Sequence, residues 1–232
     1  MQPLDFQEGT VLLVDKPLEW TSFDVVNFLR ARISRAAKVK KIKVGHAGTL
    51  DPLATGLLLI CTGKKTKEIE KLQGFDKEYT GTFKIGATTP SYDGETEENQ
   101  HFEIDGITET ALRQAASELT GAIEQIPPLF SAIKIDGKKA YTHARKNHDI
   151  ELKARPVHIY QFELAAIDLP FVSFRVQCSK GTYIRSLAHD FGKKLNNGAY
   201  LTALRRTKIG DYSIDDALSL EDAERLITGI NI

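Results

Sequence analysis

Short apolar runs and amphipathic stretches alternate along the 232 residues of the chain. Residues 79–85 alternate Tyr, Gly, Phe and Ile with Thr, Thr and Lys, which predicts a half-buried strand. Residues 57–61 are continuously apolar and predict a buried strand. In residues 23–34 apolar side chains recur at helical spacing, and Thr21 and Ser22 before them are typical N-cap residues. The pattern therefore predicts a chain that mixes helices and strands.

The same reasoning assigns the rest of the chain. Strands are predicted at residues 10–14, 57–61, 79–85, 130–135, 157–167, 171–178 and 199–209, and helices at residues 23–34, 64–72, 108–119, 138–146, 183–195 and 220–226. Residues 88–100 are polar and turn-rich and predict a mobile loop, and Asp136-Gly137 predicts a hairpin turn. We therefore expect one α+β domain over residues 1–232, built on a mixed, largely antiparallel sheet flanked by helices.

The charges of the chain cancel in number but not in position. It has 31 basic and 31 acidic residues, so the formal net charge is zero. The cations gather at Arg30, Arg32, Arg35, Lys38, Lys40, Lys41 and Lys43, followed by Lys64, Lys65 and Lys67; at Lys134, Lys138, Lys139, Arg145 and Lys146; and at Lys193, Lys194, Arg205, Arg206 and Lys208. Acidic side chains collect in residues 93–124 and 211–224. Phosphate binding depends on local potential, so this segregation is compatible with a cationic face for nucleic acid, although solvated charge runs are also common.

Composition also bears on the compartment of the protein. Cys61 and Cys178 are too few for a disulfide framework or a structural zinc site, which predicts reduced thiols in a cytoplasmic protein. The first fifteen residues lack a basic segment followed by a long apolar one, so we expect no signal peptide. A membrane span needs about 20 apolar residues, and the longest apolar runs are far shorter. No association with a membrane is expected.

Residues 45–56, GHAGTLDPLATG, are better suited to presenting chemistry than to packing. Three glycines permit tight backbone conformations, and Asp51 is the only carboxylate of the segment. Pro52 favours an extended conformation at Asp51 and removes a backbone donor. The segment can therefore display Asp51 on a stiff loop, but an Asx-type turn with a capping aspartate would use the same residues.

The same twelve residues resemble the catalytic loop of the pseudouridine synthase B family. Other signatures of that family are matched in the family's order over nearly the whole chain. They are Asp15-Lys16-Pro17 with Thr21-Ser22, Lys77-Glu78-Tyr79, Ile126-Pro127-Pro128, Ser131-Ala132-Ile133-Lys134, Arg155-Pro156-Val157, Cys178-Ser179-Lys180-Gly181-Thr182-Tyr183-Ile184-Arg185 and Leu204-Arg205-Arg206. Glu19, where the family commonly has glycine, and Phe130, where an aromatic hydroxyl is frequent, depart from the pattern.

The resemblance implies the pseudouridine synthase fold and the isomerisation of uridine 55 in the T-loop of tRNA to pseudouridine. In this reaction the bond from uracil N1 to the ribose is cleaved, the base turns, and it rejoins the ribose through C5 without a cofactor. The implied partner is tRNA, bound by its T-arm and elbow, with no protein partner required and the chain a monomer. We expect no C-terminal RNA-binding (PUA) domain, which leaves the grip on tRNA to the cationic clusters. The family implies no metal, and the sequence has no His-x-x-x-His or Cys-x-x-Cys pair.

Three residues match the catalytic positions of the family. Asp51 would act either as a nucleophile on the anomeric carbon of the ribose or as a base that removes a ribose proton, and the residues leave both routes open. Arg185 matches the residue that pairs with this carboxylate and keeps it ionised. Tyr79 matches the tyrosine that stacks on the target base, although it could also be a core aromatic at the end of a strand.

Three further residues match substrate-binding positions. His46 corresponds to the residue that lies against nucleotides turned out of the T-loop, and its alternative role is that of a turn residue. Tyr183 and Leu204 correspond to positions that complete the uracil pocket, with core packing as the alternative for both. Asp93 in the loop at residues 88–100 could contact RNA or lie in a solvated turn.

Other readings of the sequence stay open or are rejected. The chain could be an RNA-binding or tRNA-folding module in which Asp51 is structural, or a guide-dependent synthase of the dyskerin type. Lys16 is expected to be a structural residue at a strand end. Gly63-Lys64 is not part of a Walker phosphate loop, because Leu58 stands where that motif requires glycine.

Overall fold

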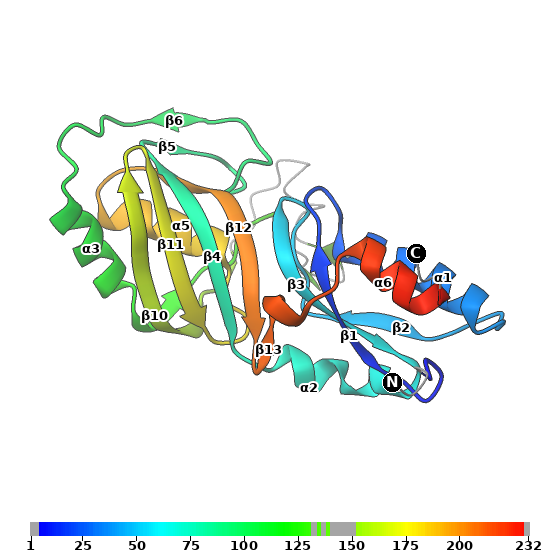
Figure 1. Ribbon diagram of the computed structural model, residues 1–232. Coiled ribbons are helices and arrows are strands. Elements are labelled where there is room, and N and C mark those ends of the chain that lie inside the picture. The colour runs from blue at the N-terminus through cyan, green and yellow to red at the C-terminus, as the bar shows by residue number, and fades with distance from the viewer. Residues whose placement is uncertain (1–4, 131–133, 136–137, 140–151, 230–232) are drawn as a thin grey trace. The chain divides into compact units, whose positions relative to one another are not determined.

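The computed structural model describes residues 5–130, 134–135, 138–139 and 152–229. The helices among them are α1 Ser22–Ala36, η1 Gly63–Glu68, α2 Ile69–Gln73, α3 Glu109–Glu118, α5 Ile184–Lys194, η2 Ile214–Asp216 and α6 Leu220–Thr228. The strands are β1 Val11–Lys16, β2 Val44–Ala47, β3 Ala54–Thr62, β4 Lys77–Ile85, β5 Ala87–Thr88, β6 Gln100–His101, β7 Gly121–Gln125, β8 Lys134–Ile135, β9 Lys138–Lys139, β10 Arg155–Asp168, β11 Phe171–Cys178, β12 Ala199–Ile209 and β13 Tyr212–Ser213. Two compact units are formed (Figure 1), the first by residues up to 79 with those from 204 onward and the second by residues 80–203.

Strand β3 is the centre of the sheet in the first unit. Along one edge it pairs antiparallel with β1, with Lys16 opposite Gly56. Along the other edge its residues 59–62 pair antiparallel with β2, and its residues 54–56 pair parallel with β12. The parallel pairing brings residues 204–206, late in the chain, beside the point where the Asp51 segment enters β3.

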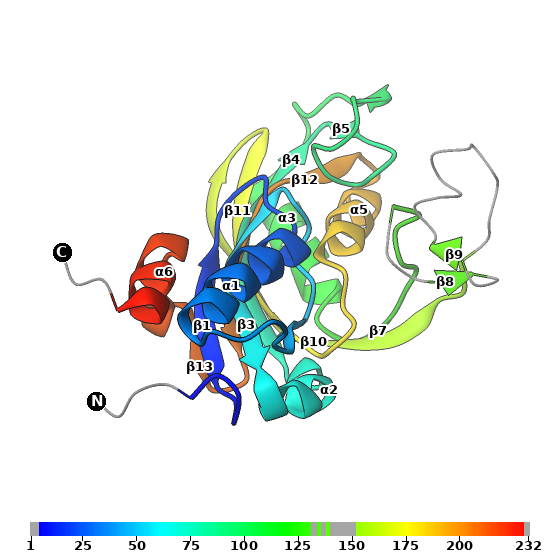
Figure 2. The same ribbon diagram turned by 90° about the vertical axis from the view of Figure 1, so that its right-hand side faces the viewer.

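Both faces of β3 are covered, which explains its continuous apolar run. Successive side chains of a strand point to opposite faces. Leu58 and Ile60 accordingly join the core beneath α1 and α6, whereas Leu57, Leu59 and Cys61 join a second core with Leu72 of α2 and Ile209 of β12. Figures 1 and 2 show α1 and α6 side by side over β1 and β3. The segment that follows Asp51 is therefore anchored on both faces.

Helix α1 begins at a capping box and buries one face. The Thr21 hydroxyl accepts a hydrogen bond from the Asp24 N–H at 3.0 Å, and the Asp24 carboxylate accepts one from the Thr21 N–H at 2.9 Å. The buried side chains of the helix are Ser22, Val25, Val26, Leu29 and Ile33. The predicted helix and its capping residue Thr21 are confirmed.

The second unit is a sheet with the strand order β12, β4, β11, β10, β7. Strand β10 pairs antiparallel with β11 and with β7. An aromatic core covers one face, where Phe83 of β4 stacks on Phe174 of β11 with ring centroids 4.2 Å apart, and the Phe191 ring of α5 lies 5.4 Å from that of Phe83. Burial of such large rings contributes strongly to stability, so α5 is firmly fixed on this sheet.

The mixed, largely antiparallel sheet is confirmed, and some details of the prediction are wrong. The helix predicted at residues 138–146 is wrong at its start, because Lys138–Lys139 form β9 and pair antiparallel with β8. A two-residue Asp-Gly turn favours such a hairpin, but Asp136, Gly137 and residues 140–146 lie outside the described residues. The helix predicted at residues 64–72 begins as the 3-10 helix η1. Strands β2 and β7 were not predicted, and the single domain over residues 1–232 stays a prediction.

Candidate active site

Residues 48–53 join β2 to β3 and carry the half-buried Asp51. The Asp51 carbonyl accepts a hydrogen bond from the Ala54 N–H at 3.0 Å, so the chain turns directly into the strand. Gly48 and Gly56 have φ of 90° and 104°, values that side chains rarely allow. A Cβ at Gly56 would also lie 2.3 Å from the carbonyl oxygen of Arg206. The expected position of Asp51 on a glycine-bounded loop is confirmed.

The Arg206 side chain joins this loop to β12. It is 1% exposed, and its Nε donates to the Leu57 carbonyl at 2.8 Å. Its Nη2 donates to the Gly48 carbonyl at 3.0 Å and its Nη1 to that of Thr49 at 3.5 Å. A planar guanidinium with five fixed donors can satisfy several carbonyls at once. One buried cation therefore holds the residues on both sides of Asp51.

Lys16 supports the loop from the end of β1. It is fully buried, and its Nζ donates to the carbonyls of Trp20 at 2.6 Å, Pro17 at 2.9 Å and Pro52 at 3.4 Å. Burial lowers the pKa of Lys16 to about 8, against the opposing effect of the Asp51 carboxylate, which raises it. The prediction of a structural residue at a strand end is confirmed, and this residue is also electrostatically coupled to Asp51.

The first unit also contains three of the predicted base-binding residues. Half-buried His46 lies in β2 opposite Ile60, and half-buried Leu204 lies in β12 opposite Ala54, so both flank the strand into which the Asp51 loop leads. Burial lowers the pKa of His46, and the charge of Arg206 acts in the same direction, so the ring is neutral at pH 7. Tyr79 lies in β4 and is 8% exposed. The roles assigned to these residues stay predictions.

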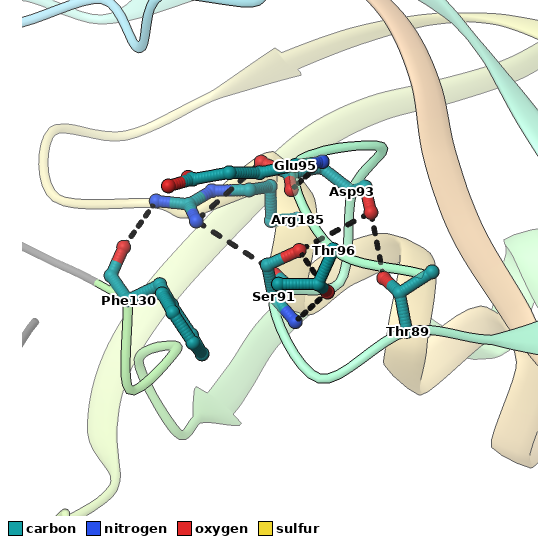
Figure 3. A network of polar contacts seen from close by, with 7 residues as sticks. All are labelled: Thr89, Ser91, Asp93, Glu95, Thr96, Phe130 and Arg185. Atoms are coloured by element: carbon teal, nitrogen blue, oxygen red, sulfur yellow. Dashed lines mark hydrogen bonds and ion pairs between the residues drawn. The ribbon is translucent and has the colours of Figure 1, made fainter. Parts of the chain in front are cut away.

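Arg185 is the centre of a buried polar network in the second unit (Figure 3). It projects from the first turn of α5 and is 4% exposed. Its Nη1 lies 3.5 Å from Oδ2 of Asp93 and donates to the Ser91 carbonyl at 3.3 Å, and its Nη2 donates to the Phe130 carbonyl at 2.8 Å. Asp93 is 5% exposed, so the solvated turn considered for it is wrong. The carboxylate is instead buried beside a cation, as a desolvated charge requires.

The Asp93 turn is fastened by its own hydrogen bonds. The Asp93 carbonyl accepts from the hydroxyls of Thr89 at 2.7 Å and Ser91 at 3.2 Å, and the Asp93 carboxylate accepts from the Glu95 N–H at 3.0 Å (Figure 3). The polar composition of residues 88–100, which predicted a mobile loop, therefore supplies hydroxyls that order this turn. Single-sequence reasoning did not foresee the contact with Arg185, because nothing in either segment marks a partner so distant in the chain.

Arg185 and Asp51 lie in different units, each described by itself, so their ion pair stays a prediction. Tyr183 lies two residues before Arg185 and is the N-cap of α5. Its N–H donates to the Gln125 side chain at 2.7 Å, and its carbonyl accepts from the same amide at 3.1 Å. The Arg155 guanidinium lies 5.0 Å from the centroid of the half-buried Tyr183 ring. The backbone of Tyr183 is thus fixed, and its role in the uracil pocket stays a prediction.

A second contact fastens the Asp93 turn to α5. Tyr92 has φ of 64°, and its ring stacks on that of His189 with centroids 4.0 Å apart and planes at 10°. His189 stands four residues after Arg185, so both project from the same side of α5. Burial lowers the pKa of His189 to about 4, so this ring is neutral at pH 7.

The cationic clusters divide into structural and exposed members. In the third cluster Arg206 is buried, because it occupies an inward position of β12, so its assignment to a surface cluster is wrong. The exposed members of the first cluster lie in the last turn of α1 and in the segment after it; they are Arg35, Lys38, Lys40, Lys41 and Lys43. Arg145 and Lys146 of the second cluster lie outside the described residues.

Neither a metal centre nor a membrane span is evident in the described part of the chain. Among its His, Cys, Asp and Glu side chains, no group of three could hold a metal ion. None of its helices is both long and apolar enough to cross a bilayer.

Cys61 is a buried thiol. Burial raises its pKa to about 11, which keeps the thiol protonated at pH 7.

Comparison with known proteins identifies the family. Residues 35–184 match the TruB family pseudouridylate synthase (N terminal domain), and residues 185–228 match the tRNA pseudouridylate synthase B C-terminal domain. The chain belongs to the TruB family of pseudouridylate synthases. This membership makes the chain an isomerase, as the family resemblance implied. The two matched regions together include the Asp51 loop and the segment around Arg185.

Two relatives and one solved structure show how far the TruB likeness extends. The chain is 58% identical to the tRNA pseudouridine synthase B of Flavobacterium johnsoniae, over 95% of this chain and 96% of that one. It is 56% identical to that of Phocaeicola vulgatus, over 94% and 93%. A solved Cbf5-Nop10-Gar1 complex contains a similar chain, with 30% identity and a TM-score of 0.69 over 94% of this chain and 54% of that chain. The predicted pseudouridine synthase fold is thereby confirmed.

Proposed function

We propose that this TruB family member converts uridine 55 in the T-loop of tRNA to pseudouridine. The proposal is supported by its high identity to two proteins named tRNA pseudouridine synthase B. The main structural support for the proposal is the loop of Asp51. This residue lies between two glycines with positive φ, and the buried cations Arg206 and Lys16 hydrogen-bond to the loop. A carboxylate on a fixed loop meets the reaction's need for one well-placed ionised group.

In the proposed reaction the N1–C1′ bond breaks and its electron pair passes to the uracil, which spreads the charge over two carbonyls. Asp51 either attacks C1′ or removes a ribose proton to give a glycal-type intermediate. The base then turns and C5 bonds to C1′. This breaks the Asp51–C1′ bond on the first route and is accompanied by return of the removed proton to the ribose on the second. The C5 proton is then lost and N1 gains a proton. Atoms and electrons balance without an oxidant or reductant, so no cofactor is required.

The other predicted residues prepare the base for this step. A base inside folded RNA must be turned out before its glycosidic bond can react. We propose that Tyr79 stacks on the uracil, that Tyr183 and Leu204 complete its pocket, and that neutral His46 lies against displaced nucleotides. Arg185 would hold Asp51 ionised, while its contacts with Asp93 and the Ser91 carbonyl keep the guanidinium in place.

The decisive experiment maps pseudouridine in unmodified tRNA incubated with the purified protein. We expect modification at position 55, its loss in Asp51→Asn and Arg185→Ala, and unimpaired tRNA binding by Asp51→Asn. A chain that binds tRNA but modifies nothing would be an RNA-binding module. Modification only when a guide RNA is added would favour a guide-dependent synthase, and the 30% identity to a chain of the Cbf5-Nop10-Gar1 complex makes that arm worth including.

A further inference from the structure

Three large apolar side chains are exposed around the Asp51 loop of the first unit. Leu18 is 53% exposed, Phe23 59% and Leu53 38%. An isolated exposed apolar residue needs no explanation, but neighbouring ones commonly mark a binding surface. We call these three residues the apolar rim.

The rim residues stand on two segments that hydrogen bonds hold alongside each other. The Glu19 N–H donates to the Pro52 carbonyl at 2.8 Å, which joins the neighbours of Leu18 and Leu53. The Ser22 hydroxyl accepts from the Leu50 N–H at 2.8 Å and donates to the Leu50 carbonyl at 3.1 Å, next to Phe23. The Asp51 loop is therefore hydrogen-bonded to the segment that carries the exposed Leu18 and Phe23.

The same helix adds positive charge beside the rim. The Arg30 guanidinium lies 6.0 Å from the centroid of the Phe23 ring. Arg30 also donates to the Val44 carbonyl at 2.9 Å, which links this side of α1 to the strand of His46. An aromatic ring with a neighbouring guanidinium is a combination that binds unpaired nucleotides.

We propose that the apolar rim, with Phe23 as its main platform, binds an unpaired base that flanks the target uridine of the RNA substrate. The inference rests on the proposed function and adds a contact to it. Turning a uridine out of a folded loop unstacks its neighbours. A neighbouring base that stacks on Phe23 would recover part of that lost stacking, while Arg30 attracts a phosphate. The chemistry favours RNA over a protein partner because these side chains border the loop of the catalytic carboxylate.

The test compares Phe23→Ala with the matched control Phe171→Ala, a ring that is 46% exposed at the start of β11. We expect Phe23→Ala to weaken binding of unmodified tRNA about 5- to 150-fold, the range for loss of one base–aromatic stack. The salt dependence of binding should not change, because no charge is removed. Phe23→Trp should bind as tightly as the wild type, and Phe171→Ala should leave the dissociation constant unaltered.

A direct probe is a T-arm hairpin with 2-aminopurine beside the target uridine, whose fluorescence falls when the base stacks. We expect quenching with the wild type and with Phe171→Ala, and much less with Phe23→Ala. Equal affinity and equal quenching for Phe23→Ala and the wild type would overturn the proposal. A wild type that forms no pseudouridine would instead refute the proposed function, so the two failures are distinguishable.

Discussion

Replacing Arg206 tests whether a buried guanidinium holds the Asp51 loop. In Arg206→Met the carbonyls of Leu57 and Gly48 lose donors at 2.8 and 3.0 Å, and the 3.5 Å contact with Thr49 adds little. Hydrogen bonds from a charged group contribute about 1.5–3 kcal/mol each, so we expect a loss of about 3–6 kcal/mol. A chain of this length loses about 2–4 °C per kcal/mol, which predicts a fall in Tm of about 6–24 °C.

The neighbouring Arg205 provides the control. Its guanidinium pairs with Asp15 at 2.7 Å, but the two side chains are 42% and 33% exposed. An exposed ion pair contributes about 0.2–1 kcal/mol, so Arg205→Met should lower the Tm by about 4 °C or less. Scanning calorimetry of the wild type and both variants measures the difference. Two variants with the same Tm would show that the loop does not depend on Arg206, and our reasoning would be refuted.

Three further predictions concern Asp93, His189 and Lys16. In Asp93→Asn the buried guanidinium of Arg185 loses a charged partner. We expect the free energy of unfolding, measured in urea, to fall by roughly 3 kcal/mol and the turnover of tRNA to fall clearly. If neither value changed, the pairing of Asp93 with Arg185 would be contradicted. In His189→Ala the stack on the Tyr92 ring is lost, so turnover of tRNA should fall several-fold. His189→Phe keeps a flat ring and should restore turnover. If it does not, loss of stacking is not the cause of the fall. The pKa of Lys16 is about 8 in the folded protein and 10.5 ordinarily, so between these values the unfolded chain binds more protons and the contribution of Lys16 to stability rises with pH. In urea unfolding, the free energy of unfolding of the wild type should therefore increase relative to that of Lys16→Met between pH 8 and pH 10. A difference between the two proteins that does not change with pH would contradict the lowered pKa of Lys16.

Periodicity explains why much of the fold was predictable. The short apolar run at residues 57–61 predicts a strand covered on both faces, and Thr21 before an apolar stripe marks the start of α1. Lys138 shows the limit of this reasoning, because a basic stretch has no periodicity that separates a short strand from a helix. Lys138 in fact pairs with Ile135 in a short antiparallel ladder.

The candidate site was predictable only in part. The loop position of Asp51 was predictable because glycine and proline mark an unusual loop, and its proposed role came from the resemblance of the twelve residues to a known family. The buried pairing of Asp93 with Arg185 was not found, since their separation of 92 positions leaves no local pattern. Arg206 was assigned to a surface cluster because charge alone says nothing about the direction of a strand side chain. Tertiary placement of charged groups is thus what a single sequence conceals.

The reliance of the Asp51 loop on Arg206 has a consequence for biosynthesis. The Arg206 nitrogen that donates to Gly48 belongs to a residue 158 positions later in the chain. A ribosome that adds roughly 5–20 residues per second needs about 8–30 s to bridge that interval. Throughout this time Asp51 is already present in the nascent polypeptide, but the guanidinium that holds its loop is not. The loop would therefore take its final form only after Arg206 has been synthesised.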